Sequence, residues 1–230
     1  MLFKIVKALS WYGGRWLFKL TADHADHVPQ TGSVLVVANH ASYLDPPLVG
    51  APIRHRDTYY MARANLFRIP GIRWLLKAIH AFPVKTKGDW REGMEQAFQL
   101  FDRGEVVVVF PEGTRTRDGN LQKGKPGIGW LAYRAKVTVV PAYISGTYEA
   151  LPRGSLMIKS SRVKVVFGPP LDLTQWYQGP EVRETYQRIA DEMIEGIRRA
   201  GEQNKKSEVR SQKSELERTK NQKSLGVDRS

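Results

Sequence analysis

The sequence predicts a single α/β domain built on a mixed, largely parallel sheet flanked by helices. The chain has 230 residues, of which 41% are hydrophobic and 10% aromatic, and this is enough to bury one sizeable core. Short β-branched runs alternate with segments of helical periodicity, which is the pattern of an α/β fold. No stretch approaches the roughly 18 consecutive apolar residues that a membrane-spanning helix needs, so we do not expect a transmembrane protein.

The predicted elements follow one another in regular alternation. Six short apolar runs predict strands, at Val34–Ala38, Thr58–Met61, Ala81–Val84, Val106–Phe110, Val137–Ile144 and Val163–Phe167. Helical patterns occupy Leu66–Ile79, Trp90–Arg103, Ile128–Lys136 and Glu181–Arg199. Ligands of such sheets bind beyond the carboxyl ends of the strands, so the residues that follow each run are the candidates for chemistry.

The first twenty residues form a separate segment, with four cations, no acid and several aromatic residues. On a helix the four cations fall within an arc of about 120° and most apolar side chains point elsewhere, as in an interfacial helix. Arg15 and Lys19 interrupt the apolar character, which argues against a cleaved secretory signal. We expect residues 1–20 to hold the protein peripherally or monotopically on the cytoplasmic face of a membrane; the alternative is a helix packed on the domain's own core.

Two further boundaries are predicted, giving a main domain over residues 21–200 and a tail over residues 201–230. The tail has no aromatic residue and many charges, so we expect it to be disordered. The whole chain carries 36 Lys and Arg against 23 Asp and Glu, a net charge of +13. Such a charge favours an anionic partner, which is a nucleic acid, an anionic lipid surface or a phosphorylated substrate.

Several kinds of chemistry are excluded by what the sequence lacks. There is no cysteine, which removes disulfides, thiolate nucleophiles and cysteine-bound metals. The five histidines are scattered, so we expect no metal site and no cofactor. No G-x-S-x-G motif is present either, which argues against a serine nucleophile on a strand-to-helix turn.

The first candidate site follows the predicted strand Val34–Ala38, where Asn39, His40 and Asp45 stand close together. A carboxylate that binds one nitrogen of a histidine leaves the other nitrogen as a proton acceptor, so this pair could act as a general base. The alternative is structural: Asp45 followed by Pro46 is also the start signal of a helix.

The second candidate site follows the predicted strand Val106–Phe110 and contains Glu112, Gly113, Thr114 and Arg115. Guanidinium groups match phosphate oxygens in pairs and glycine permits close approach of the backbone, so this turn suits an anion. The alternative is an ordinary surface turn. A third basic cluster, Lys85 and Lys87, follows the predicted strand Ala81–Val84 and is expected at the same edge of the sheet.

These motifs together resemble the 1-acyl-glycerol-3-phosphate acyltransferase family of glycerolipid acyltransferases, over roughly residues 20–175. The family's Asn-His motif with Asp five residues after the His stands at residues 39–45, and its Phe-Pro-Glu-Gly-Thr-Arg motif stands unaltered at residues 110–115. The family's basic residue after a strand is usually Arg, and here the matching position is Lys85 or Lys87. Its apolar motif with proline appears around Val140 and Pro141.

The resemblance implies a reaction without an acyl-enzyme intermediate. His40 would take the proton of the lysophosphatidic acid hydroxyl as it attacks an acyl thioester of acyl carrier protein or coenzyme A, and Asp45 would orient His40. The motif residues of the second site, with Asn39 and Lys85 or Lys87, would bind the acceptor, and Val140 and Pro141 would line an acyl pocket. Backbone N–H groups near Gly113 are candidates for stabilising the oxyanion.

Two other functions fit parts of the sequence. The same motifs would serve an enzyme that acylates another lysophospholipid or a lyso-ornithine lipid. The net charge and the six tryptophans would also suit a non-enzymatic binder of nucleic acid or of anionic membranes. Against that binder, the informative residues follow strands and form no continuous basic stripe, so we expect no nucleic acid partner.

Overall fold

The protein is described from a computed structural model, which covers residues 2–85, 91–155 and 157–226. Its centre is a seven-stranded sheet in the order β1-β7-β6-β2-β5-β3-β4. Every neighbouring pair is parallel except β6 and β7, which are antiparallel. The predicted mixed, largely parallel sheet is therefore confirmed. Its strands are β1 (Thr21–Asp23), β2 (Val34–Ala38), β3 (Thr58–Arg63), β4 (Ala81–Val84), β5 (Val106–Val109), β6 (Thr138–Ser145) and β7 (Lys164–Phe167).

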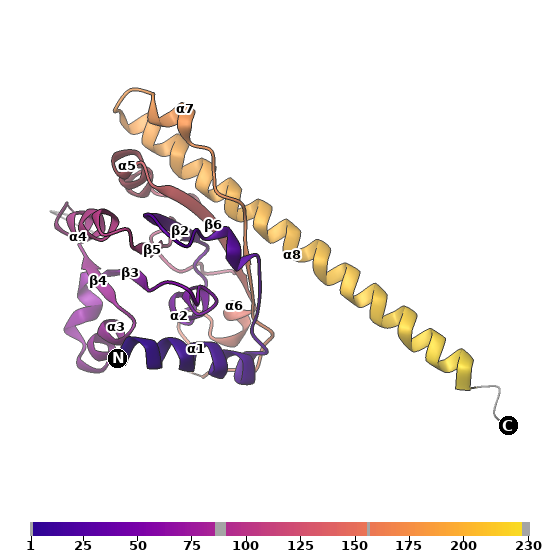
Figure 1. Cartoon of the computed structure of the whole chain (residues 1–230). Coiled ribbons are helices and arrows are strands. Elements are labelled where there is room, and N and C mark those ends of the chain that lie inside the picture. The colour runs from indigo at the N-terminus through magenta and orange to yellow at the C-terminus, as the bar shows by residue number, and fades with distance from the viewer. Residues whose placement is uncertain (1, 86–90, 156, 227–230) are drawn as a thin grey trace.

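Helices cover both faces of this sheet (Figure 1). Alternate residues of β2 and β5 point to opposite faces, as in any strand, and each set enters a different core. One core includes side chains of α1 and α2, and the other includes side chains of α4, α5 and α8. The helices are α1 (Leu2–Phe18), α2 (Asp45–Gly50), α3 (Pro70–Ala78), α4 (Arg91–Asp102), α5 (Pro126–Ala135), α6 (Thr147–Ala150), α7 (Thr174–Tyr177) and α8 (Arg183–Gly226), with short 3-10 helices at Ala25–His27 and Ala64–Arg68.

The short helices α2, α6 and α7 and the 3-10 helix Ala25–His27 were not among the predicted elements, and two further differences concern β1 and the helix after β3. The strand β1 was not predicted, because three residues without an apolar run carry no periodicity; it exists through parallel pairing with β7. The predicted helix Leu66–Ile79 is divided into a 3-10 helix and α3, which begins at Pro70. Proline lacks an N–H and fits the first turn of a helix, so it starts a new helix here.

The register of the central strands determines where the two main motifs meet. Val34 of β2 pairs with Val106 of β5, and Val37 pairs with Val109, all in parallel. The chain therefore leaves β2 and β5 at the same edge of the sheet, and the two strand ends lie side by side. The residues that follow, His40 after β2 and Glu112 after β5, are brought together by this register.

Helix α1 lies with one side against the domain. Phe3, Gly14 and Phe18 are buried, and a Cβ on Gly14 would lie 2.9 Å from Leu20. The Phe3 ring stacks on His80 with centroids 3.8 Å apart. The alternative of core packing is therefore observed for this side of the helix. Its other side leaves large apolar side chains exposed, namely Leu2, Ile5, Leu9, Tyr12, Trp16 and Leu17.

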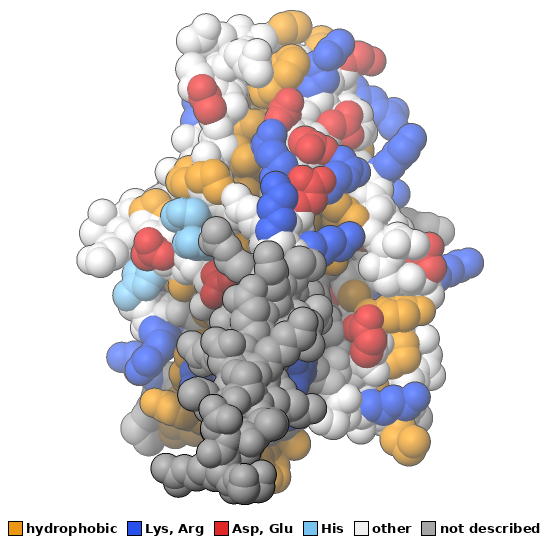
Figure 2. Space-filling view, turned by 90° about the vertical axis from the view of Figure 1, so that its right-hand side faces the viewer, with side chains coloured by type: hydrophobic (Ala, Val, Ile, Leu, Met, Phe, Trp, Pro, Cys, Tyr) orange, Lys and Arg blue, Asp and Glu red, His pale blue; other side chains and the backbone are white. Residues whose placement is uncertain are grey.

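Helix α8 packs on the domain at its start and then projects far beyond it (Figure 1). Sequence analysis predicted disorder from residue 201, whereas α8 continues as a helix to Gly226. The low apolar content misled that prediction, because residues 202–225 lack glycine and proline and consist mostly of residues with good helix propensity. Figure 2, seen from the side of this projection, shows basic and acidic side chains intermixed in the part of the face above the grey residues.

No helix in the described ranges has the length and apolar character required to cross a bilayer.

Candidate active site

The end of β2 is fixed by Asn39, which is buried. Its side-chain amide donates to the backbone oxygen of Ile144 at 2.9 Å and accepts from the N–H of the same residue at 2.8 Å. Both polar atoms of the amide are therefore engaged with β6. Sequence analysis expected Asn39 to help bind the acceptor; in the structure its side-chain amide joins the ends of β2 and β6.

His40 and Asp45 face each other, as the first motif predicted. The Nδ1 atom of His40 lies 2.8 Å from Oδ2 of Asp45, which is fully buried. The same oxygen accepts the backbone N–H groups of Ala41 and Ser42, at 2.6 and 2.7 Å. Because a carboxylate only accepts, Nδ1 carries the hydrogen and Nε2 is left as the proton acceptor.

The surroundings of this pair favour a fixed imidazole. The ring of His40 stacks on Phe110 with centroids 4.2 Å apart, and the His40 side chain keeps 16% of its surface exposed. Helix α2 does begin at Asp45, but no side-chain capping bond is made there. The carboxylate is thus directed at His40 and not at the helix terminus, and it holds the imidazole ring in one orientation.

Glu112 links the loop after β5 to the loop after β2. It is 1% exposed; its Oε1 accepts the backbone N–H of His40 at 2.7 Å, and its Oε2 accepts that of Gln122 at 3.1 Å. Burial raises the pKa of Glu112 to about 7, although the two backbone N–H groups act in the opposite direction. Sequence analysis placed Glu112 against the acceptor, whereas its carboxylate is occupied in joining two loops.

Gly113 shapes the turn that follows. Its φ of +68° is a left-handed conformation that glycine adopts without strain, and its N–H donates to the oxygen of Phe110 at 2.9 Å. That N–H is therefore engaged and does not supply the oxyanion donor that sequence analysis suggested near Gly113. The oxygen of Gly113 accepts Nη2 of Arg63 at 2.7 Å.

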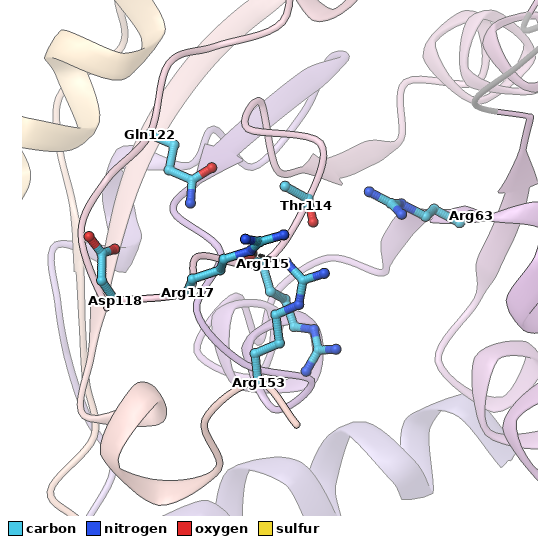
Figure 3. A pocket seen from close by; sticks show the side chains of 7 residues that line it. All are labelled: Arg63, Thr114, Arg115, Arg117, Asp118, Gln122 and Arg153. Atoms are coloured by element: carbon cyan, nitrogen blue, oxygen red, sulfur yellow. Dashed lines mark hydrogen bonds between the residues drawn. The ribbon is translucent and has the colours of Figure 1, made fainter. Parts of the chain in front are cut away.

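Beyond Gly113 lies an open cleft of about 600 Å³. Guanidinium groups dominate it: the side chains of Arg115, Arg117 and Arg153 extend into one space, and Arg63 points towards it from β3 (Figure 3). The complete lining is Arg63, Thr114, Arg115, Arg117, Asp118, Gln122 and Arg153. The structure thus brings the predicted residues Thr114 and Arg115 to a strongly basic cleft.

Five lining residues were not predicted: Arg117, Asp118 and Gln122 follow the second motif along the chain, whereas Arg63 and Arg153 come from other segments. Arg63 is the last residue of β3, so its position at the carboxyl end of a predicted strand was the signal that could have identified it. Arg153 follows α6, in a segment without a motif, and no local pattern indicated it. Only the fold brings it to the cleft.

The lining of the cleft has four arginines and only one acidic residue, so it keeps a net positive charge. That residue, Asp118, accepts hydrogen bonds from Thr116 and from the backbone and side chain of Asn120. These bonds lower the pKa of Asp118 to about 2. Partial burial lowers the pKa of Arg115, and nearby Arg153 acts in the same direction. A cleft of this charge is suited to an anion that carries more than one oxygen acceptor.

The cleft and the His40 loop adjoin. The N–H of Thr116 donates to the oxygen of His40 at 2.8 Å. The guanidinium of Arg115 lies 3.5 Å from the ring centroid of Tyr43, which belongs to the His40 loop. A ligand whose anionic group occupies the cleft therefore lies next to the loop that carries the His40 and Asp45 pair.

The remaining predicted site residues lie elsewhere. Lys85 is exposed at the end of β4 and is not among the residues lining the cleft, and Lys87 falls outside the described residues. Val140 is fully buried in the core, and Pro141 packs beneath α8, where a Cβ on Gly196 would lie 3.1 Å from it. Core packing fills the space around these two residues, where sequence analysis expected an acyl pocket. In the ranges that the structure describes, no three His, Asp or Glu residues gather as they would around a metal ion.

Comparisons with known proteins agree on one family. A family model described as Acyltransferase matches residues 19–145. The 1-acyl-sn-glycerol-3-phosphate acyltransferase of Bacillus subtilis (strain 168) is 31% identical over 147 residues, which are 64% of this chain and 70% of that protein. The chloroplastic 1-acyl-sn-glycerol-3-phosphate acyltransferase LPAT1 of Arabidopsis thaliana is 28% identical over 158 residues, 67% of this chain and 44% of that protein. The chain thus matches less than half of the plant protein.

A solved structure has the same fold. The crystal structure of the 1-acyl-sn-glycerophosphate (LPA) acyltransferase PlsC from Thermotoga maritima superposes with a TM-score of 0.70 and 24% identity, covering 88% of this chain and 79% of that one. At this identity the likeness concerns the fold.

Proposed function

This chain belongs to the Acyltransferase family, as its motifs predicted, and we propose that it transfers a fatty acyl group from a thioester to the free sn-2 hydroxyl of 1-acyl-glycerol-3-phosphate, making phosphatidic acid. One observation carries the proposal: the His40 and Asp45 pair adjoins a cleft with four arginines. The pair suits deprotonation of an alcohol, and the cleft suits a phosphate.

The proposed reaction has one nucleophilic step and no acyl-enzyme. Nε2 of His40 accepts the hydroxyl proton as the oxygen forms a bond to the thioester carbon, and the carbon–sulfur bond then breaks. The proton passes from His40 to the departing sulfur, so the imidazole returns to its neutral form. Asp45, 2.8 Å from Nδ1, stabilises the imidazolium while it exists.

The arginine cleft supports a phosphorylated acceptor over an ornithine-containing one. A phosphate monoester at neutral pH carries close to two negative charges and offers three terminal oxygens to guanidinium groups. An ornithine headgroup carries an ammonium beside its carboxylate, so it brings no net negative charge to four arginines. The donor is an acyl thioester of acyl carrier protein or of coenzyme A, and both are offered to the enzyme in the test.

The test of the proposed function is a crossed assay with purified protein. Acyl carrier protein and coenzyme A thioesters are each combined with 1-acyl-glycerol-3-phosphate, with lysophosphatidylglycerol and with lyso-ornithine lipid. We expect the monoester acceptor to have the highest kcat/KM with whichever donor is used. Preference for lyso-ornithine lipid, or no transfer with any pair, would refute the proposal.

We also propose that the exposed side of α1 seats the enzyme on an anionic membrane, where acceptor and product reside. Leu9 is 65% exposed and Trp16 is 83% exposed, Lys4 and Arg15 are exposed on the same helix, and Lys19 is exposed just after it. Apolar side chains combined with cations are typical of helices that lie in the bilayer interface.

Deleting α1 would remove Phe3 and Phe18 from the core, so substitutions of exposed residues are the sharper test. Leu9→Ser combined with Trp16→Ser should reduce sedimentation with phosphatidylglycerol vesicles several-fold and leave thermal stability unchanged. Val182→Ser, an exposed apolar residue just before α8, is the matched control and should sediment like the unmodified protein. Equal sedimentation of all three proteins would remove α1 as the membrane contact.

A further inference from the structure

Arg153 belongs to a segment that the family motifs do not include. The family model ends at residue 145, and Arg153 lies in the connection between α6 and β7. This connection starts against the His40 loop, because the hydroxyl of Ser42 donates to the oxygen of Leu151 at 2.8 Å. It ends against α1, where the N–H of Val163 donates to the oxygen of Phe18 at 2.9 Å. The position of Arg153 is thus set at both ends of its segment.

The side chain of Arg153 is directed into the arginine cleft (Figure 3). Its Nη1 donates to the backbone oxygen of Arg115 at 3.3 Å, which brings the two arginines together. The guanidinium of Arg115 is engaged with the Tyr43 ring on the other side. Both side chains line the same cleft, so their like charges repel each other and the arrangement favours an anion that binds both arginines.

We propose that Arg153 is a specificity-determining residue that binds the phosphate of the acceptor together with Arg115 and favours a phosphate monoester over a phosphate diester. The inference rests on the proposed function, because it names the acceptor class of the same site. It adds to the acceptor's binding site a residue from outside the range that the family model matches.

The preference follows from counting charges and oxygens. A monoester presents three terminal oxygens and nearly two negative charges, whereas a diester presents two oxygens and one charge. Arg63, Arg115 and Arg117 also line the cleft. Arg153 adds a further guanidinium, and its charge and donors count most for the acceptor that has a second negative charge and a third terminal oxygen.

The experiment compares Arg153→Gln with the unmodified enzyme on two acceptors that differ at one group. These are 1-acyl-glycerol-3-phosphate and its methyl phosphodiester. We expect the substitution to raise KM for the monoester about 10-fold, with kcat and the diester KM changed less than 2-fold. Arg153→Lys, which keeps the charge and loses the planar fork, should fall between the two. Arg153 is exposed, so the substitution is not expected to unfold the protein.

Lys159→Gln is the matched control, because Lys159 is an exposed cation of the same segment that does not line the cleft. It should leave both KM values unchanged. Equal losses on monoester and diester in Arg153→Gln, or the same loss in Lys159→Gln, would overturn the proposal. If the unmodified enzyme acylates neither acceptor, the proposed function fails. In that case, calorimetry with glycerol 3-phosphate tests whether Arg153 binds a phosphate. Weaker binding to Arg153→Gln than to the unmodified protein supports the proposal, and equal binding overturns it.

Discussion

The loop after β2 and the loop after β5 lie at the ends of neighbouring strands, yet they hold their functional groups in opposite ways. In the first loop, Asp45 is fully buried and its Oδ2 contacts His40 and two backbone N–H groups. In the second loop, Arg115 and Arg117 are only partly buried or exposed and face an open cleft. The comparison indicates that the group proposed to move a proton is fixed by the fold, while the groups proposed to bind the acceptor keep freedom to adjust.

The largest effect should come from the fixed loop. His40→Ala should lower kcat by roughly 10² to 10⁴, the range usual for loss of a general base, with little change in acceptor KM. Steady-state kinetics on 1-acyl-glycerol-3-phosphate measure this. His24→Asn, which removes a histidine at the far edge of the sheet and suits its left-handed backbone, should keep full activity. Near-normal turnover in folded His40→Ala would end the assignment of His40 as base.

Glu112, which joins the two loops, should make the stability of the protein depend on pH. The pKa of Glu112 is raised from 4.5 to about 7 in the folded state, so the folded protein binds this proton more tightly than the unfolded chain. The stabilisation from the proton is fully present below pH 4.5 and is lost as the pH rises through about 7. It amounts to about 3 kcal/mol at most.

Urea unfolding at pH 5 and pH 8 measures this effect. Glu112→Gln cannot ionise, so the free energy of unfolding of the unmodified protein should fall relative to this variant between the two pH values. Glu149→Gln, which removes an exposed carboxylate, is the control and should track the unmodified protein. A constant difference between the unmodified protein and Glu112→Gln would show that Glu112 does not titrate in this range.

A smaller effect on the kinetics is expected from a substitution in the loop after β5. Arg115→Lys keeps the charge but loses the planar pair of donors, so KM for the acceptor should rise about 10-fold while KM for the thioester stays constant. The ratio of the two KM values separates acceptor binding from a general disturbance of the loop. A change confined to the thioester KM would place Arg115 at the donor instead.

The smallest effect should come from the contact that joins the loops at the surface. Tyr43→Leu removes the ring under Arg115, and a cation–π contact at an exposed site is worth about 0.5 to 1 kcal/mol. Acceptor KM should therefore rise about 2- to 5-fold with kcat unchanged. Tyr43→Phe, which keeps the ring, should restore the original KM. A fall in kcat would instead mean that Tyr43 positions His40.

The sequence was sufficient to predict elements that have a local pattern of residues. Val34–Ala38 was predicted to the residue because a continuous apolar run between polar residues is a local pattern. The pairing of His40 with Asp45 was predictable from five-residue spacing at a strand end. The structure also gives two motif residues contacts that the sequence did not predict. Asn39 and Glu112 are polar and stand beside the base, but burial and backbone partners, which no spacing reveals, determine what they touch.

Contacts between distant segments could not be predicted from the sequence, because they depend on how the strands pair. Arg153 reaches the cleft through the path of the chain between α6 and β7, and that path depends on the antiparallel pairing of β7 with β6. The three residues of β1 form a strand only because β7 lies beside them. The continuation of α8 to Gly226 reflects good helix-forming residues, a signal that the low apolar content of the segment outweighed.

The Glu112 bridge has a practical consequence for protein engineering. A design that grafts only His40, Asp45 and the arginines onto another scaffold would carry the reacting and binding groups without the carboxylate that sets the spacing between their loops. The graft would also need the two backbone N–H donors of residues 40 and 122 in place. The smallest transplantable unit is therefore a pair of loops with their shared buried acid, and not a set of side chains.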